Sequence, residues 1–351
     1  MSKRVGIEIG SCKTKIVVMK TSKNKKEVSD FRIIDTVEGV YTQGGDVQLS
    51  LMEGPIHDAL KDMKVGQGQL YIAINHESVI VRTRSLPYSE ESVTDNLIRF
   101  EAENFLPYDI NEFNIDYKVL NVQEKKDDET DPAYDQEPAQ EQANKKFVQN
   151  VMIVAAPKSL LNQYAELAKG LRLKLKVLTV YAEAIDKYLY ASPSSKDNNC
   201  LYVDIGKSYI NMIMYSKKEY FASLRSHYGI EYLLEQLMRD HDQDLEESIK
   251  DIFQRSRIDM DHMKSETILN GYQKLSDEIN KMIDFFRSRE YGAFVDEIHL
   301  LGGGANLKDF KDFLCENNHI KVMILEDDHL NKSVGDFCHS LIPAVGACID
   351  K

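Results

Sequence analysis

Cysteine is scarce and scattered in this sequence, which limits the structural chemistry open to it. The 351 residues include five cysteines, an odd number, and no two of them form a Cys-x-x-Cys pair. This pattern fits neither a disulfide framework nor a zinc site. It indicates reduced thiols in a cytosolic protein.

Long apolar runs are also missing. No stretch reaches the roughly 18 consecutive apolar residues that a membrane-spanning helix needs. The first residues lead directly into an apolar strand pattern, so we expect no signal peptide. The chain is therefore expected in the cytoplasm, without a membrane anchor of its own.

Positive charge is the third deficit. The chain has 44 lysines and arginines against 57 acidic residues, a net charge of −13. This balance argues against a nucleic-acid partner, because binding a phosphate backbone requires clustered lysine and arginine. The rest of the composition is that of a globular protein, and the length favours two lobes or domains, each with its own core.

The first informative stretch is residues 5–19, which read as an apolar strand, a small-residue turn and a second apolar strand. Gly10 and Ser11 in the turn leave room for backbone amides to face an anion, and Glu8 lies two residues before the glycine. This is the pattern of a phosphate loop with a metal-side acid. An ordinary hairpin explains a single copy better.

A second copy changes that balance. Residues 200–214 repeat the order of strand, acid, glycine, small polar residue and strand, with Asp204, Gly206 and Ser208 at the matching places. A third cluster, Gly302 to Gly304, follows an apolar strand. Consecutive glycines there would let a flat ring or a sugar approach the backbone closely.

Two further segments are informative. A long amphipathic helix is expected over residues 269–289, and it carries Glu278 and Lys281 three positions apart on one face. That pair alone is equally consistent with an exposed salt bridge. Between the two hairpins, a helix, two strands and a helix are followed by a strand at 174–180, which the pattern groups into one small α+β subdomain.

Together, the two hairpins and the glycine cluster resemble the actin, Hsp70 and sugar-kinase superfamily, and within it the PilM family of type IV pilus assembly proteins. The narrower resemblance covers nearly the whole chain apart from one polar insert. It rests on residues 86–87, 101–108, 116–120, 277–286 and 343–347. The implied fold is α/β: a two-lobed actin-like fold with a small inserted α+β subdomain in the first lobe.

The expected domain division follows the same order. The first lobe takes residues 1–85 and the inserted subdomain 86–177, within which the polar segment 123–146 is expected to be mobile because it is acidic and of low complexity. A crossing helix and linker take 178–199. The second lobe takes 200–351.

The resemblance implies that ATP and Mg²⁺ bind between the lobes. Amides of the two turns would grip the phosphates, and Glu8 and Asp204 would hold magnesium through water. The glycine cluster would carry the adenine, and Asn306 would cap the following helix. The implied nucleotide contacts are Gly10, Ser11, Cys12, Lys13, Lys15, Gly206, Lys207, Ser208, Glu278, Lys281, Gly302, Gly303, Gly304 and Asn306.

Two of these residues have alternative interpretations. Lys15 either neutralises phosphate charge or faces solvent. Cys12 is expected to be a small polar filler of the turn and not a nucleophile, because no histidine accompanies it locally.

The sequence also departs from the family pattern. Glu8 replaces the usual aspartate, Lys207 and Ile210 are bulky for the second turn, and residues 179–182 replace the usual Asp-x-Glu-Pro. Glu8, Asp204 and Glu183 remain as catalytic candidates. Binding requires only contacts that hold the nucleotide, whereas hydrolysis also requires an aligned attacking water. We therefore expect ATP binding with slow turnover or none.

By resemblance, the partner is the cytoplasmic tail of a PilN-like inner-membrane protein, which would hold the chain at the membrane, and other pilus assembly proteins and self-association are further possibilities. One alternative is an FtsA-like division scaffold, although no basic amphipathic segment closes the sequence. Another is a small-molecule kinase of the same superfamily. Such an enzyme needs an acid that serves as base in the cleft, and no obvious candidate is present.

Overall fold

The computed structural model describes residues 3–22, 25–42, 46–124, 147–191, 198–326 and 338–350. The chain forms two compact units, the first made of residues 1–77 and 160–351 and the second of residues 78–159. The polar segment expected to be mobile, 123–146, lies outside the described residues from residue 125 onward.

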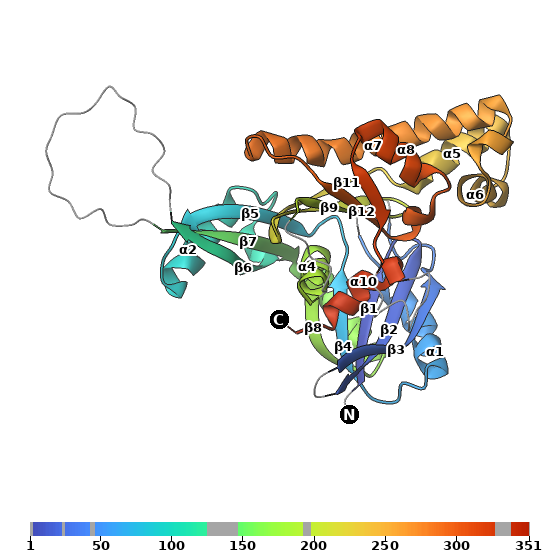
Figure 1. Ribbon diagram of the computed structural model, residues 1–351. Helices are drawn as coiled ribbons and strands as arrows, with labels where there is room; N and C mark the ends of the chain where they lie inside the picture. The colour runs from blue at the N-terminus through green and yellow to red at the C-terminus, as the bar shows by residue number, and fades with distance from the viewer. Residues whose placement is uncertain are drawn as a thin grey trace, which may run out of the picture. The chain divides into compact units, whose positions relative to one another are not determined.

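The first unit contains two five-stranded sheets with the same strand arrangement (Figure 1). The first sheet has the order β3-β2-β1-β4-β8, with β1 (Lys3–Ile9), β2 (Lys13–Ser22), β3 (Lys25–Asp35), β4 (Gln69–Ile74) and β8 (Lys174–Val180). The second has the order β11-β10-β9-β12-β13, with β9 (Cys200–Ile205), β10 (Ile210–Ser216), β11 (Glu219–Ser226), β12 (Glu297–Leu301) and β13 (Lys321–Ile324).

The two sheets also match in strand direction. In each, three antiparallel strands are followed by two strands that pair in parallel. The two hairpins expected from the sequence are therefore confirmed as the β1–β2 and β9–β10 hairpins of a duplicated sheet.

The central strands of both sheets are covered on both faces. From Val5 to Ile9 every residue of β1 is buried, and all of β9 is buried. Such strands appear in a sequence as continuous apolar runs. The acids that interrupt these runs, Glu8 and Asp204, are therefore carried into the protein interior near the ends of their strands.

Strand β8 does not join the small subdomain with which the sequence pattern grouped it. It pairs in parallel with β4, with Tyr71 opposite Val177. The partner of a strand is decided by contacts distant in sequence, which its own residue pattern does not encode.

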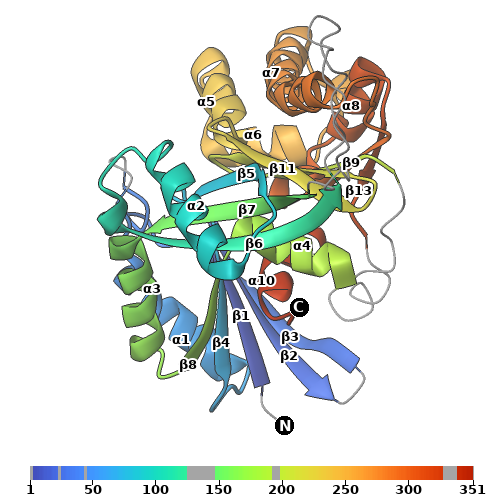
Figure 2. The same cartoon turned by 90° about the vertical axis from the view of Figure 1, so that its left-hand side faces the viewer.

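Helices cover both faces of the first sheet. On one face α10 (Cys338–Ala347) packs against α4 (Tyr181–Ala191) and against β1, β2 and β4. Figure 2 shows α1 (Glu53–Asp62) and α3 (Lys158–Gly170) on the opposite face. The short helix η1 (Leu49–Met52) leads into α1.

Close packing under α10 requires two glycines. A Cβ on Gly6 would meet the carbonyl oxygen of Ala344, and a Cβ on Gly346 would meet that of Ala184. Glycine at these places lets the sheet, α10 and α4 approach at backbone distance.

One apolar core holds the second sheet to its helices. The core joins buried side chains of β9, β10 and β12 to those of the helices, with Leu233, Tyr272 and Phe310 among them. The elements outside the sheet are α5 (Ile230–His241), α6 (Leu245–Phe253), η3 (Arg257–Asp259), α7 (His262–Arg289), η4 (Gly303–Asn306) and α8 (Phe310–Asn318).

Helix α7 begins seven residues before the expected start at residue 269. The side chain of Asp261 accepts a hydrogen bond from the backbone N–H of Lys264, which caps the helix there. Across the described ranges, no helix is both long and apolar enough to cross a bilayer.

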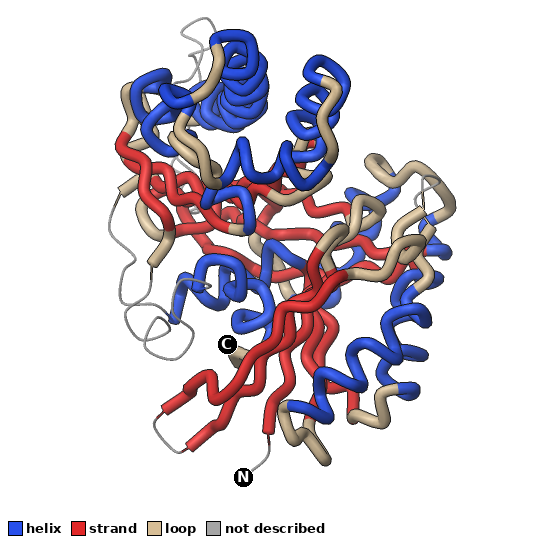
Figure 3. Tube along the Cα trace, turned by 90° about the vertical axis from the view of Figure 1, so that its right-hand side faces the viewer, coloured by secondary structure: helices blue, strands red, loops and turns tan. Residues whose placement is uncertain are grey.

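The second unit is a three-stranded antiparallel sheet with one main helix (Figure 2). Figure 3 shows the first unit from its other side, with strands in red and helices in blue. Its core holds Leu86, Ile98, Val151 and Ile153. Its elements are β5 (Ile80–Pro87), α2 (Glu91–Glu103), η2 (Ile110–Glu112), β6 (Phe113–Glu124) and β7 (Phe147–Pro157), in the sheet order β5-β7-β6.

Two helical glycines provide a matched test of this packing. Gly346→Ala is expected to destabilise the protein by about 1–3 kcal/mol, because the added methyl group has no space against α4. In α1, a Cβ on Gly54 meets no described atom within 4 Å, so Gly54→Ala should stabilise by about 0.5–1 kcal/mol. Urea denaturation measures both changes, and equal stability of the two variants would contradict the packing account.

Candidate nucleotide site

The β1–β2 and β9–β10 turns have the same backbone hydrogen bond. The N–H of Gly10 donates to the carbonyl of Lys13 at 3.2 Å, and the N–H of Gly206 donates to the carbonyl of Tyr209 at 2.9 Å. In each turn a Cβ on the glycine would press on that same carbonyl, at 2.9 and 3.0 Å. The same tight turn is thus built twice, each time just after a buried acid.

Glu8 is held by two partners. One carboxylate oxygen, Oε2, lies 3.0 Å from the ammonium of Lys15, its cross-strand neighbour on β2. The other, Oε1, accepts a hydrogen bond from the side-chain amide of Asn75 at 3.2 Å. Of the two orientations left open by the sequence, Lys15 takes the inward one, with only 16% of its side chain exposed.

Asp204 accepts a hydrogen bond from the first residue of α4. The hydroxyl of Tyr181 donates to Asp204 Oδ2 at 2.5 Å. On its other side lies Gly302, where a Cβ would collide with Asp204 Oδ1. Gly302 has φ 72°, a backbone conformation that favours glycine.

The two acids lie within electrostatic reach of each other. Burial, and next to it the charge of Glu8, raises the pKa of Asp204 to about 6. Burial alone would lower the pKa of Lys15, yet the carboxylates of Glu8 and Asp204 raise it above its usual value. Two buried acids and one half-buried lysine are therefore grouped within electrostatic reach of one another.

A polar bridge joins the two sheets beside these acids. Arg225 on β11 donates to Asn211 Oδ1 at 2.8 Å and also to the side-chain oxygen of Asn75, which follows β4. Nearby, the hydroxyl of Tyr209 donates to Glu77 at 3.2 Å. Burial lowers the pKa of Arg225, whose guanidinium lies over the Tyr209 ring.

Side chains of both turns have acidic partners. In the second turn, Glu231 of α5 accepts from the hydroxyl of Ser208 at 3.0 Å and pairs with Lys207 at 3.2 Å. In the first turn, Lys13 pairs with Asp35 at 2.5 Å, and both side chains are at least half exposed. Ser11 is half-buried in this turn, and Cys12 is exposed.

The glycine cluster is crowded at two of its three positions. Besides the Cβ at Gly302, a Cβ on Gly304 would collide with the side chain of Ile205. A Cβ on Gly303, in contrast, meets no atom of the described residues within 4 Å, and Gly303 is exposed. Of the three glycines, Gly303 is therefore the one that faces open space.

Asn306 does not cap the following helix, contrary to the expectation. Helix α8 begins at Phe310 with Asp309 before it, whereas Asn306 ends the separate short helix η4. Its side-chain amide lies 3.2 Å from Nε2 of His339 instead. The cap of α8 is therefore Asp309, three residues after Asn306.

Glu278 and Lys281 form an ion pair with each other on α7, at 2.6 Å. The acid is buried and also accepts from the hydroxyl of Ser226, the neighbour of Arg225, at 2.8 Å. Although burial alone would raise the pKa of Glu278, the hydrogen bonds from Lys281 and Ser226 lower it. On α4, Glu183 pairs with Lys187 at 3.6 Å.

The sequence pattern did not single out Arg225, Asn75 or Tyr181. Asn75 lies in a polar turn, which gives no local sign of a contact with Glu8. A single arginine in the otherwise uncharged interior of β11 was a usable signal, since a buried guanidinium needs partners. The segment around Tyr181 was noticed only as a departure from the family pattern.

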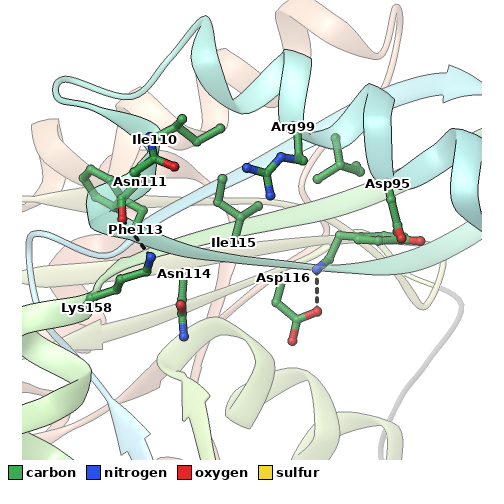
Figure 4. Close-up of a pocket in the computed structure, with 11 residues that line it drawn as sticks. Asp95, Arg99, Ile110, Asn111, Phe113, Asn114, Ile115, Asp116 and Lys158 are labelled. Carbon is green, nitrogen blue, oxygen red and sulfur yellow. Dashed lines mark hydrogen bonds between the residues drawn. The ribbon is translucent and has the colours of Figure 1, made fainter.

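The second unit has a cavity of its own, of about 460 Å³ (Figure 4). Charged and apolar side chains share its wall. Lys158 donates to the backbone carbonyl of Asn111 at 2.8 Å, which fixes one end. The lining residues are Asp95, Ile98, Arg99, Ile110, Asn111, Phe113, Asn114, Ile115, Asp116, Tyr117 and Lys158.

Comparison with known proteins decides the family. The family model described as type IV pilus assembly protein PilM matches residues 6–332. The chain belongs to the PilM family. A solved chain of a PilM-PilN type IV pilus biogenesis complex is similar to it with a TM-score of 0.77 and 19% identity, and the match covers 98% of this chain and 97% of that chain.

A more distant similarity points to the same fold. The ethanolamine utilization protein EutJ from Carboxydothermus hydrogenoformans matches with a TM-score of 0.58 and 13% identity, over 100% of this chain and 90% of that chain. The expected fold class is confirmed: this PilM-family chain has the two-lobed actin-like fold.

The raised pKa of Asp204 gives a pH-dependent prediction. A carboxyl group whose pKa rises on folding costs stability when ionised, so its cost grows as pH rises from about 4 to 6. Asp204→Asn should therefore match the parent protein near pH 4 and exceed its stability by about 1–3 kcal/mol at pH 7.5. Denaturation in metal-free buffer tests this, and a difference that does not change with pH would contradict it.

Proposed function

We propose that this PilM-family chain binds ATP with Mg²⁺ in the cleft between its two sheets and acts as an adaptor in type IV pilus assembly. The observation that carries the proposal is the duplicated turn, each copy placed just after a buried acid, with the two acids within electrostatic reach of each other. The proposal keeps the expected order of first lobe, inserted subdomain, crossing helix with linker at 178–199, and second lobe at 200–351. The expected subdomain bounds, 86–177, are replaced by residues 78–159, since β8 joins the first sheet.

The charge of the cleft supports a magnesium ion. Two buried carboxylates within electrostatic reach of each other suit a cation, and of the two nearby positive charges only Lys15 pairs directly with an acid, Glu8, while Arg225 acts on Asp204 from farther away. Magnesium retains several waters and needs few direct carboxylates, so Glu8 and Asp204 would hold it through water. The ion would neutralise phosphate charge.

Backbone amides of the two turns would hold the phosphates. Glu231 would have to leave Lys207 and Ser208, and its side chain is 41% exposed and so has room to turn away. Gly303 would lie under the adenine, because it faces open space beside Asp204 and Gly302. The paired Glu278 and Lys281 would then lie toward the ribose.

Slow hydrolysis is consistent with the contacts of the acids. Glu8 is held by Lys15 and Asn75, and Asp204 by Tyr181. Glu183, the third catalytic candidate, pairs with Lys187. A base that activates water must be within reach of that water and able to accept its proton. Each of these acids would first have to leave its present partners.

Nucleotide binding would be sensed through the polar bridge. Arg225 contacts Asn75, and Tyr209 contacts Glu77, so both contacts cross from the second sheet to the first. A ligand that binds one lobe arrangement better shifts the population toward it. Phosphates between the turns would compete for Arg225 and so change how the lobes are held.

The partner would be the cytoplasmic tail of a PilN-like membrane protein. The similar solved chain comes from a PilM-PilN complex. The cavity of residues 78–159 combines apolar walls with Arg99, Lys158, Asp95 and Asp116, which suits a peptide with apolar and charged side chains. Such a tail would hold this chain at the inner face of the membrane, where other pilus proteins or further copies could join it.

Gly303 provides a test of the nucleotide proposal. Gly303→Leu should leave stability unchanged but lower the affinity for Mg·ATP at least about tenfold, because the side chain would occupy the adenine position. Gly66→Leu is the matched control, since a Cβ there also meets no described atom within 4 Å. Titration calorimetry measures both. Absence of ATP binding by the parent protein, or equal affinities of the two variants, would contradict this assignment.

Arg99 provides a test of the partner proposal. An immobilised N-terminal peptide of the PilN-like protein should retain the full chain in a pull-down, with and without Mg·ATP. Arg99→Glu, which reverses a charge in the cavity wall, should lower retention at least about tenfold, whereas Arg82→Glu, on an exposed arginine of the same unit outside the cavity, should not. No retention of the parent protein in either state would contradict the adaptor role.

A further inference from the structure

A group of side chains of the types that bind metals lies away from Glu8 and Asp204, at the start of two neighbouring strands. Cys200 is the first residue of β9, and Glu297 is the first residue of β12. The two are direct partners across the parallel strands, and His299 follows two residues later on the same face. Their ligand atoms all lie within 4.8 Å of one another.

We propose that Cys200, Glu297 and His299 form a binding site for a divalent transition-metal ion, and that the ion is Zn²⁺. Thiolate, imidazole and carboxylate are the three ligand types that zinc uses in proteins. The imidazole Nε2 of His299 and Oε2 of Glu297 are 3.2 Å apart. Two ligands on neighbouring corners of a zinc tetrahedron are separated by about 3.3 Å, as follows from metal-ligand distances near 2 Å.

The surroundings hold these ligands in place. The second oxygen of Glu297, Oε1, accepts from the ammonium of Lys321 on β13 at 2.9 Å, which leaves Oε2 directed at His299. The ring of Tyr202 stacks on the imidazole at 5.0 Å between centroids. Supporting contacts of this kind orient ligands in known metal sites.

Charge balance also favours zinc. A thiolate and a carboxylate together neutralise a divalent ion, while the imidazole adds no charge. Cys200 and Glu297 are both buried, at 5% and 6% exposure, and a neutral site avoids the cost of an unpaired buried charge. Lys321 is 57% exposed on its side chain, so its positive charge is screened by solvent.

One ligand of the proposed site, Cys200, borders a cavity. The cavity has a volume of about 180 Å³ and is also lined by Tyr202, Tyr215 and Asp186. A zinc ion with three protein ligands takes a water or another small ligand at its fourth position. Because β9 carries Asp204 and β12 leads into Gly302, the ion would fasten the beginnings of the two strands whose far ends line the nucleotide cleft.

Sequence spacing could not suggest this site. The three ligands come from two strands about one hundred residues apart, whereas the familiar zinc signatures place cysteines two to four residues from each other. The sequence-based expectation of no zinc site considered only such local pairs.

Cobalt and zinc uptake by the chelator-treated full chain tests the proposal. The parent protein should bind about one Zn²⁺ per chain by elemental analysis, and with Co²⁺ it should show a thiolate-to-cobalt charge-transfer band. Cys200→Ser should abolish the band. Cys12→Ser is the matched control and should retain it, because Cys12 is the exposed thiol where adventitious metal would bind.

A second variant and a second measurement cover the risk that Cys200→Ser fails to fold. Zinc should raise the Tm of the parent protein but not that of His299→Gln, while both should have similar Tm values in chelator. His299→Gln should weaken zinc affinity more than about 100-fold. The proposal is overturned if the parent protein takes up no metal, if the band survives Cys200→Ser, or if it is lost in Cys12→Ser.

Discussion

The burial of two carboxylates, Glu8 and Asp204, at the ends of the central strands is the constraint on which the rest of the site depends. A buried charge must find a partner, and breaking a buried pair by removing one member typically costs about 3–5 kcal/mol. Lys15 forms an ion pair with Glu8, Asn75 donates a hydrogen bond to it, and Tyr181 donates one to Asp204. These partners come from β2, from the turn after β4 and from α4, so the acids connect the elements of both sheets.

The duplicated architecture explains why the two acids occupy matching places in their sheets. Each sheet places its central strand between an antiparallel hairpin partner and a parallel neighbour, and each strand ends in the same glycine turn. Asn75 links the two halves by contacting Glu8 with its amide nitrogen and Arg225 with its amide oxygen. One asparagine side chain thus couples an acid of the first sheet to an arginine of the second.

Local pattern was sufficient to predict the hairpins and their acids, because strand, turn and strand are encoded by neighbouring residues. The family followed from several such stretches in order. The sequence analysis wrongly grouped β8 with the small subdomain and wrongly assigned the helix cap to Asn306, because both features depend on where distant segments meet. Arg225 and Glu231 escaped notice for the same reason, since their partners lie elsewhere in the chain.

The central claim is that Glu8 and Asp204, one from each of the duplicated sheets, hold the magnesium ion of one bound ATP. The most direct measurement is a crystal structure of the full chain grown with Mn²⁺ and a non-hydrolysable ATP analogue, with the metal located by its anomalous signal. The account predicts one metal between residues 8 and 204, with phosphates at both glycine turns. A nucleotide bound elsewhere, or a metal remote from both acids, would contradict it.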